Sequence, residues 1–112
     1  GLQRRNWLHV LDHCRALCLV LEQGIPGEIY NIGGSCEKTN LEIIRMILTQ
    51  TGQPDSMIAY VPDRPGHDFR YHMDSSKILR ALGWQPEIAF DQGMRETIAW
   101  YVKHFSCKAT AN

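Results

Sequence analysis

The sequence predicts a small, helix-rich α/β domain with about four helices and two or three short strands. Its 112 residues suffice for one small domain but not for two, and 44% of them are hydrophobic. Apolar residues recur at helical spacing in several stretches, whereas runs typical of strands are short and few. Such strands cannot make a doubly wound sheet of their own. We therefore expect a single domain over residues 1–112, with residues 106–112 as a disordered tail.

The first predicted helix follows an extended segment, Trp7 to Val10, and covers about His13 to Glu22. Asp12 is well placed as its N-cap, and Gly24 ends it. Its residues are apolar on nearly every side, which is typical of a helix that is buried on more than one face.

The remaining helices are marked by caps and turn residues. Thr39 and Glu42 have the spacing of a capping box, and the helix that they begin ends at Gly52. Further helices are predicted from Asp74 or Ser75 to Leu82 and from Phe90 to Phe105. Three runs have the composition of short strands, namely residues 28–32, 57–61 and, more briefly, 69–73.

The overall charge is balanced, with 12 basic and 12 acidic residues. A nucleic-acid-binding domain usually carries a basic excess, so we expect no nucleic-acid partner. No apolar run approaches the roughly 18 to 20 residues that cross a bilayer, so we expect no membrane partner.

The four cysteines do not have the spacing of a disulfide scaffold, which favours a reducing, cytoplasmic location. Cys14 and Cys18, with His13, could form half a metal site. The same spacing is typical of small buried side chains on a helix, and we favour that interpretation. No bound metal is therefore expected.

The densest group of polar residues is the stretch 63–71, in which Arg64 and His67 flank a proline–glycine turn. A guanidinium held beside such a turn suits a diphosphate, because its planar donors match the phosphate oxygens. The alternative is a solvated loop with local ion pairs.

Two weaker candidates lie elsewhere in the chain. Arg5 stands beside an aromatic residue and could hold a phosphate, although a basic segment with one buried tryptophan would look the same. Asn40 opens the second helix, where free N–H groups would favour an anionic or polar ligand. The alternative is that Asn40 only helps to cap the helix.

The motifs that would carry chemistry are missing from this sequence. It contains no dinucleotide-binding glycine fingerprint, no phosphate-binding GxxxxGK[ST] and no HExxH zinc motif. Gly33-Gly34 alone is more typical of a turn than of a phosphate cradle. We therefore predict no catalytic and no cofactor-binding residue.

Several stretches resemble, in order and spacing, the dTDP-glucose 4,6-dehydratases over about residues 5–105. The stretch 63–71, which reads D-R-P-G-H-D-x-R-Y, is the most specific of them. The others are Arg5-Asn6-Trp7-Leu8-His9-Val10 with Asp12-His13, Pro26-Gly27-Glu28-Ile29-Tyr30-Asn31-Ile32-Gly33-Gly34, Thr39-Asn40-Leu41-Glu42-Ile43, Leu82-Gly83-Trp84-Gln85-Pro86, and the helix ending Thr97-Ile98-Ala99-Trp100-Tyr101.

The resemblance implies the small C-terminal domain of an extended short-chain dehydrogenase/reductase, without a complete Rossmann fold. Members of that family hold NAD in an N-terminal Rossmann domain and the sugar nucleotide in the C-terminal one. The resemblance further implies that Arg5, Asn40, Arg64 and His67 contact the nucleotide diphosphate and its surroundings. The family's catalytic Tyr-x-x-x-Lys and acid–base pair lie upstream, so we expect this chain alone to bind no NAD and to be inactive.

Two residues depart from the family pattern: Asn6 stands in place of Asp, and His9 in place of Tyr. Both lie close to Arg5, whose orientation is therefore in question.

The expected function is a partial dehydratase, which contributes dTDP-sugar binding to the NAD-dependent conversion of dTDP-glucose to its 4-keto-6-deoxy sugar. An alternative is a non-catalytic structural protein. Its apolar first helix would then drive homo-oligomer formation or pairing with a separate N-terminal half. A related epimerase or decarboxylase fragment is a third option, which the stretch 63–71 disfavours.

Overall fold

A two-stranded antiparallel sheet joins two pairs of helices in the computed structural model, which describes residues 1–105. The elements in chain order are β1 (Arg4–Trp7), α1 (Val10–Gln23), β2 (Cys36–Thr39), α2 (Asn40–Thr51), the 3₁₀-helix η1 (Asp55–Met57), α3 (Ser76–Leu82) and α4 (Phe90–Phe105). The predicted mixed α/β class with four helices is confirmed. The predicted tail, residues 106–112, lies outside the described residues.

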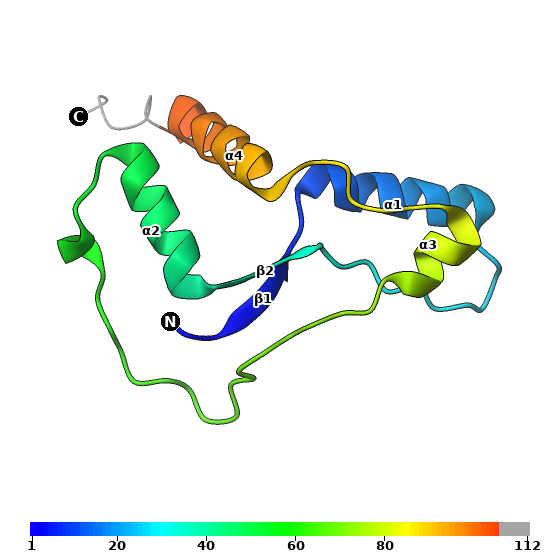
Figure 1. The fold of residues 1–112 in the computed structure, drawn as a ribbon, viewed down its shortest axis with the longest axis horizontal. Helices are drawn as coiled ribbons and strands as arrows, with labels where there is room; N and C mark the ends of the chain where they lie inside the picture. Colours follow the sequence, from blue (N-terminus) through cyan, green and yellow to red (C-terminus); the bar gives the residue numbers. More distant parts are fainter. Residues whose placement is uncertain (106–112) are drawn as a thin grey trace.

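The helices pack as two separate clusters, on either side of the β1–β2 pair (Figure 1). Ala16 of α1, Ile78 of α3 and Trp84 form one buried cluster. The buried side chains of the second pair, α2 and α4, are Ile43, Leu48 and Ile98. The strands therefore connect two small cores and do not cover a single large one.

The pairing of β1 with β2 was not predicted. Trp7 lies opposite Cys36, and Arg4 lies opposite Thr39. The Trp7 indole N–H also donates to the carbonyl oxygen of Lys38 at 3.0 Å. Because β2 reads Cys-Glu-Lys-Thr, it lacks the alternation of apolar and polar residues by which a half-buried strand is recognised.

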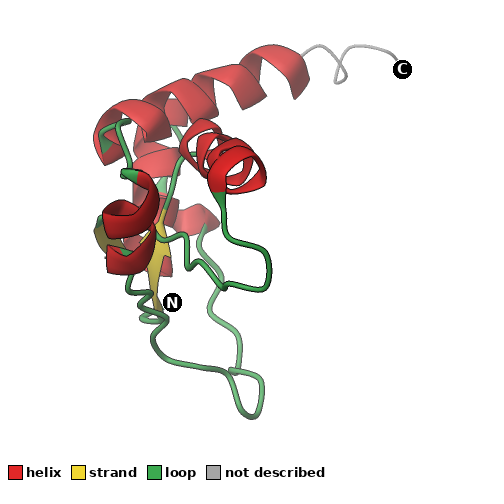
Figure 2. Ribbon diagram, turned by 90° about the vertical axis from the view of Figure 1, so that its right-hand side faces the viewer, coloured by secondary structure: helices red, strands yellow, loops and turns green. Residues whose placement is uncertain are grey.

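The predicted strands at 28–32, 57–61 and 69–73 do not form within the described residues. A strand exists only where its backbone bonds a neighbour, and no neighbour reaches the first two runs. The third makes one isolated bridge, between Arg70 and Arg4. Residue 57 ends η1, and residues 58–61 begin the long connection that leads to α3. Loops extend away from the helices at the lower end of the molecule (Figure 2).

The predicted helix ends are confirmed for α2, α3 and α4. The capping box at the start of α2 is complete, since Thr39 and Glu42 each bond the other's backbone. Gly52 and Gly83 end α2 and α3 in the left-handed conformation, with φ of 68° and 71°. That conformation favours glycine because it has no Cβ.

The prediction that Asp12 is the N-cap of α1 is wrong. His9 takes that place, and its Nδ1 accepts the N–H of Leu11 at 3.3 Å. Asp12 lies one turn further along and is completely buried. Its carboxylate accepts the N–H groups of Glu87 and Ile88, and therefore ties α1 to the segment before α4. A side-chain cap at the start of α1 was therefore predicted correctly, but the capping residue is His9 and not Asp12.

Much of the apolar surface of α1 is exposed. The exposed fractions of Val10, Leu11, Leu17 and Leu21 are 63%, 58%, 50% and 87%. The radius of gyration is 17.3 Å, against about 13 Å expected for a compact domain of this length. The chain is therefore extended and leaves one helix face uncovered. No helix within residues 1–105 is long and apolar enough to cross a membrane.

Candidate functional site

The candidate site forms where residues 62–73 cross β1. The Arg4 N–H donates to the Phe69 carbonyl at 2.8 Å, and the Tyr71 N–H donates to the Arg4 carbonyl at 3.1 Å. These two hydrogen bonds make the parallel bridge between Arg4 and Arg70. The motif-rich loop is thereby brought against β1, although the two segments are far apart in the sequence.

The guanidinium of Arg5 is held by the chain itself. It lies over the ring of Tyr71, 4.5 Å from the ring centroid, and its Nη2 is 3.1 Å from Nε2 of His67. It also donates to the backbone carbonyls of Arg4, Asp68 and Phe69, at 2.7, 3.0 and 3.4 Å. Arg5 is therefore oriented by several contacts, and its positive charge has no carboxylate partner among these contacts.

Tyr71 is fixed beneath Arg5 by its own hydroxyl group, which donates to the carboxylate of Asp68. This hydrogen bond and the charge of Asp68 raise the pKa of the Tyr71 hydroxyl. The phenol therefore stays protonated at neutral pH, and its ring serves as a support for the guanidinium.

His67 contacts both Arg5 and Asp63. Its Nδ1 is 2.7 Å from Oδ1 of Asp63, on the side of the ring away from Arg5. Asp63 also accepts from the side chain of Gln3 at 2.5 Å and from the backbone N–H of Arg64 at 2.9 Å. The hydrogen bond with His67 is the main cause that lowers the pKa of Asp63, so this carboxylate is ionised at neutral pH.

Arg64 differs from Arg5 in that its side chain is exposed. Its guanidinium makes no hydrogen bond or ion pair within residues 1–105, while its backbone lies in the turn that bonds Asp63 and His67. Gly66 completes this turn with φ of 70°. Arg64 is therefore a cation on a defined backbone that can contact an added anion without breaking an internal bond.

Asn40 begins α2 on the other side of β1. The N–H groups that we expected to be free at this helix end are bound, because Asn40 donates to the carbonyl of Gln3 at 3.0 Å and Leu41 to that of Gly1 at 2.9 Å. Thr39 accepts the N–H of Glu42. Only the side-chain amide of Asn40 therefore remains available to a ligand.

The four predicted site residues are connected through Gln3 and Asp63. Gln3 bonds the backbone of Asn40 and the side chain of Asp63, which in turn bonds His67 and the backbone of Arg64; His67 contacts Arg5. The role of Gln3 could not be predicted from the sequence, because its partners Asn40 and Asp63 are far from it in the chain. The structure therefore brings Arg5, Arg64 and His67 together where the loop crosses β1, while Asn40 lies on the β2 side and is linked to them through Gln3.

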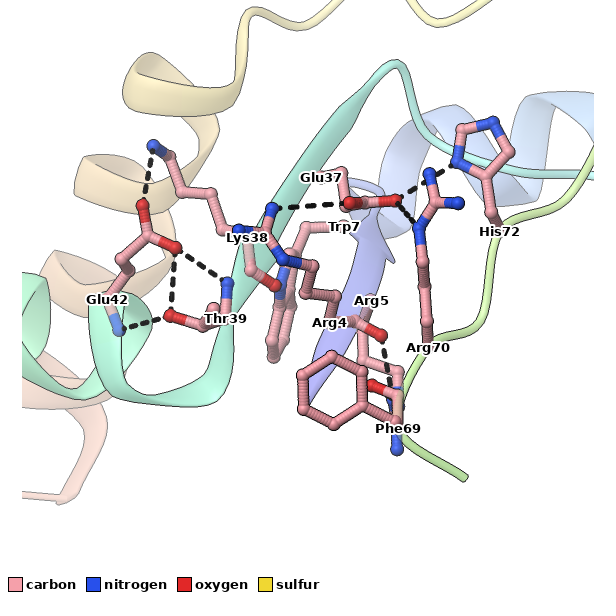
Figure 3. Close-up of polar contacts among 10 residues, drawn as sticks. All are labelled: Arg4, Arg5, Trp7, Glu37, Lys38, Thr39, Glu42, Phe69, Arg70 and His72. Carbon is pink, nitrogen blue, oxygen red and sulfur yellow. Dashed lines mark hydrogen bonds and ion pairs between the residues drawn. The ribbon is translucent and has the colours of Figure 1, made fainter. Parts of the chain in front are cut away.

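A second charged cluster was missed by the sequence analysis. Glu37 of β2 bonds Arg70 at 2.7 Å and Arg4 at 3.3 Å, and lies 3.3 Å from Nδ1 of His72 (Figure 3). The hydrogen bond from Arg70 is the main cause that lowers the pKa of Glu37. Since Glu37 bonds two residues of the crossing loop, this cluster fastens the loop to the sheet.

The two departures from the family pattern do not disturb Arg5. Asn6 donates to the carbonyl of Gly34 at 3.1 Å and accepts the N–H of Met73 at 3.2 Å. His9 is occupied as the cap of α1. Neither side chain hydrogen-bonds the guanidinium of Arg5, which is oriented by the loop instead.

The site is a surface and not a closed pocket. A half-open cavity of about 270 Å³ lies between α2 and α4 and is lined mainly by apolar side chains such as Ile43, Ile47 and Met94. None of the four predicted site residues lines it. Within residues 1–105 no three His, Cys, Asp or Glu side chains are grouped to hold a metal ion.

A family model described as GDP-mannose 4,6 dehydratase matches residues 1–97. The chain belongs to the GDP-mannose 4,6 dehydratase family. Among curated members that it resembles, the dTDP-glucose 4,6-dehydratase of Streptomyces niveus is 54% identical over 101 residues. These are 90% of this chain and 30% of that protein. The corresponding enzyme of Haemophilus influenzae is 50% identical over 113 residues, which cover 91% of this chain and 33% of the relative.

Solved structures from this dehydratase family have the same fold. The crystal structure of DesIV, a dTDP-glucose 4,6-dehydratase from Streptomyces venezuelae with NAD and TYD bound, matches with a TM-score of 0.89 and 43% identity. The match covers 96% of this chain and 33% of that one. The dTDP-glucose 4,6-dehydratase of Bacillus anthracis, in complex with NAD, matches with a TM-score of 0.86 and 46% identity. The chain thus spans about a third of the length of these relatives.

Proposed function

We propose that this chain supplies part of the dTDP-sugar-binding surface of a dTDP-glucose 4,6-dehydratase, and that the catalytic groups and the NAD site belong to a further part of the enzyme. The observation that carries the proposal is the site along β1. There the exposed guanidinium of Arg64 and the oriented guanidinium of Arg5 both lie near enough to Tyr71 for their charges to act on its pKa. Two such cations suit the charge and the donor geometry of a diphosphate.

The four predicted residues have different tasks in this proposal. Arg64 contacts the diphosphate directly, since its side chain has no other hydrogen-bonding or ion-pair partner in the described chain. Arg5 adds positive charge from a fixed position. His67 holds Arg5, and the Asn40 amide is available to the polar surroundings of the diphosphate.

The partial nature of the site is consistent with its open shape. A ligand on β1 would be covered on one side only, whereas small-molecule sites usually bury most of the ligand. We therefore expect weak binding of dTDP by this chain, and no turnover of dTDP-glucose when NAD is added. The cytoplasmic location stays a prediction from the dispersed cysteines.

Calorimetric titration with dTDP tests this proposal. The chain should bind dTDP weakly, and Arg64→Ala should reduce the affinity about tenfold, which corresponds to about 1.4 kcal/mol. Arg80→Ala is the matched control, because Arg80 is an exposed arginine at the end of α3 and away from β1. Equal affinities of Arg64→Ala and the unchanged chain would refute the proposal.

A second candidate function is self-association or pairing through α1. It is favoured by the exposed side chains of Val10, Leu17 and Leu21, which lie on one face of the helix at spacings of seven and four. Light scattering after gel filtration should show that the chain associates. The double variant Leu17→Glu and Leu21→Glu, which places two charges on this face, should be monomeric. A clean monomer at high concentration would contradict this function.

A further inference from the structure

The contact between Arg5 and His67 defines the protonation of the histidine ring. A guanidinium carries only donors, so Nε2 of His67, 3.1 Å from Nη2 of Arg5, must be the acceptor. The neutral ring then carries its proton on Nδ1. This nitrogen is 2.7 Å from Oδ1 of Asp63, which can only accept when it is ionised. Each nitrogen therefore has one partner of the correct kind.

Asp63 is itself held in place from two directions. Gln3 of the segment before β1 donates to its Oδ2, and the backbone N–H of Arg64 donates to its Oδ1. The second hydrogen bond belongs to the proline–glycine turn, in which the N–H of His67 bonds the carbonyl of Arg64 at 3.3 Å. The carboxylate therefore has a fixed position relative to both β1 and the imidazole ring.

We propose that Asp63 is a positioning residue for Arg5 and acts through His67. By accepting the Nδ1 proton, Asp63 selects the tautomer whose Nε2 lone pair faces the guanidinium. Without Asp63, the ring can carry its proton on Nε2, and this N–H would point at the N–H of Arg5. The significance for dTDP binding rests on the proposed function, but the selection of the tautomer does not.

The charged groups around His67 lie on opposite sides of its ring. His67 faces the guanidinium of Arg5 on one side and the carboxylate of Asp63 on the other, and its side chain is 20% exposed. Asp68 is engaged by the hydroxyl group of Tyr71, and Arg64 is turned to solvent. A second proton on His67 would place two cationic N–H groups against each other.

Nitrogen-15 NMR of labelled histidine tests the proposal directly. At mildly alkaline pH the long-range spectrum of the full chain should show Nδ1 of His67 protonated and Nε2 unprotonated, with the signal assigned by its loss in His67→Gln. Asp63→Ala removes the acceptor of the Nδ1 proton, so the Nε2-protonated tautomer should become populated, the ring should lose its contact with Arg5, and the Arg5 side-chain signals should change. Asp63→Asn should keep the original pattern, since an amide oxygen can still accept the Nδ1 proton and Gln3 can rotate its own amide.

The control is Asp55→Ala, which removes an exposed carboxylate paired with Arg45 and distant from the site in the fold. It should leave the signals of His67 and Arg5 unchanged. If Asp63→Ala retains the Nδ1-protonated tautomer in a folded chain, the proposal is wrong. A reversed pattern in Asp63→Asn would overturn it as well, because the hydrogen bond and not the charge is held responsible.

A dTDP titration of the same variants separates this proposal from the proposed function. If the site binds dTDP, Asp63→Ala should bind it about tenfold more weakly, and Asp63→Asn close to the unchanged chain. If the unchanged chain does not bind dTDP, the proposed function fails, while the NMR spectra still decide whether Asp63 positions Arg5.

Discussion

Asp12 is the residue whose replacement should destabilise the fold most clearly. Its side chain is completely buried and joins α1 to the segment that leads into α4. One carboxylate oxygen accepts the N–H of Glu87 at 3.2 Å and the guanidinium of Arg15 at 2.6 Å. The other accepts the N–H of Ile88 at 3.1 Å. Replacement by alanine removes all three hydrogen bonds at once.

The expected loss follows from these partners. A hydrogen bond to a charged group contributes about 1.5–3 kcal/mol, so the two backbone N–H groups account for about 3–6 kcal/mol before the site relaxes. Arg15 adds little, since it is 42% exposed and keeps Glu87 as a second partner. We therefore expect Asp12→Ala to lower the free energy of unfolding by about 3–5 kcal/mol.

Urea unfolding followed by far-UV circular dichroism measures this loss. Asp12→Asn should lie between alanine and the natural residue, because one amide oxygen can still accept while the NH₂ group faces a second donor. The control is Glu22→Ala, an exposed acidic residue of the same helix, which should change stability by no more than about 0.5 kcal/mol. A loss below about 1 kcal/mol in Asp12→Ala would refute the assignment of Asp12 as the link between these segments.

Three further changes test other parts of the structure. In Glu37→Gln the melting temperature should fall less steeply on acidification than in the unchanged chain. The folded-state pKa of Glu37 is lowered, so its carboxylate stabilises the fold at pH values above its ordinary pKa of about 4.3. This stability is lost as the pH falls through the folded-state pKa. A parallel decline in both proteins between pH 5 and pH 3 would contradict this. Thr39→Ala should cost about 1 kcal/mol in urea unfolding by removing the cap of α2, whereas Thr49→Ala, within the same helix, should not destabilise it. Gly34→Ala should cost about 3 kcal/mol, because a Cβ would lie 1.9 Å from the carbonyl oxygen of Trp7; full stability would show that the two segments can separate without loss.

The helices could be predicted because their signals are local. The capping box of Thr39 and Glu42 needs only residues three apart, and Gly83 ends α3 by its own backbone conformation. The same reasoning placed a cap before α1 but chose Asp12. Nothing in the local sequence reveals that this carboxylate is drawn into the interior by N–H groups more than 70 residues away.

The strands could not be predicted, because a strand depends on its partner. Residues 28–32 have the right composition and find no partner within the described chain, while Cys36–Thr39 has a poor composition and pairs with β1. Backbone hydrogen bonding between distant segments decided both outcomes.

For the candidate site, the sequence alone determined which residues to examine. The stretch from Asp63 to Tyr71 stood out by its charge and its turn residues, and Arg5 and Asn40 by their neighbours. Only the tertiary structure decided that Arg5 lies against His67, with its charge oriented and partly satisfied, while Arg64 stays exposed. The physical reason is that charge and turn residues are properties of a short segment and can be read from its sequence alone. Which donor meets which acceptor depends on the crossing of β1 by the loop.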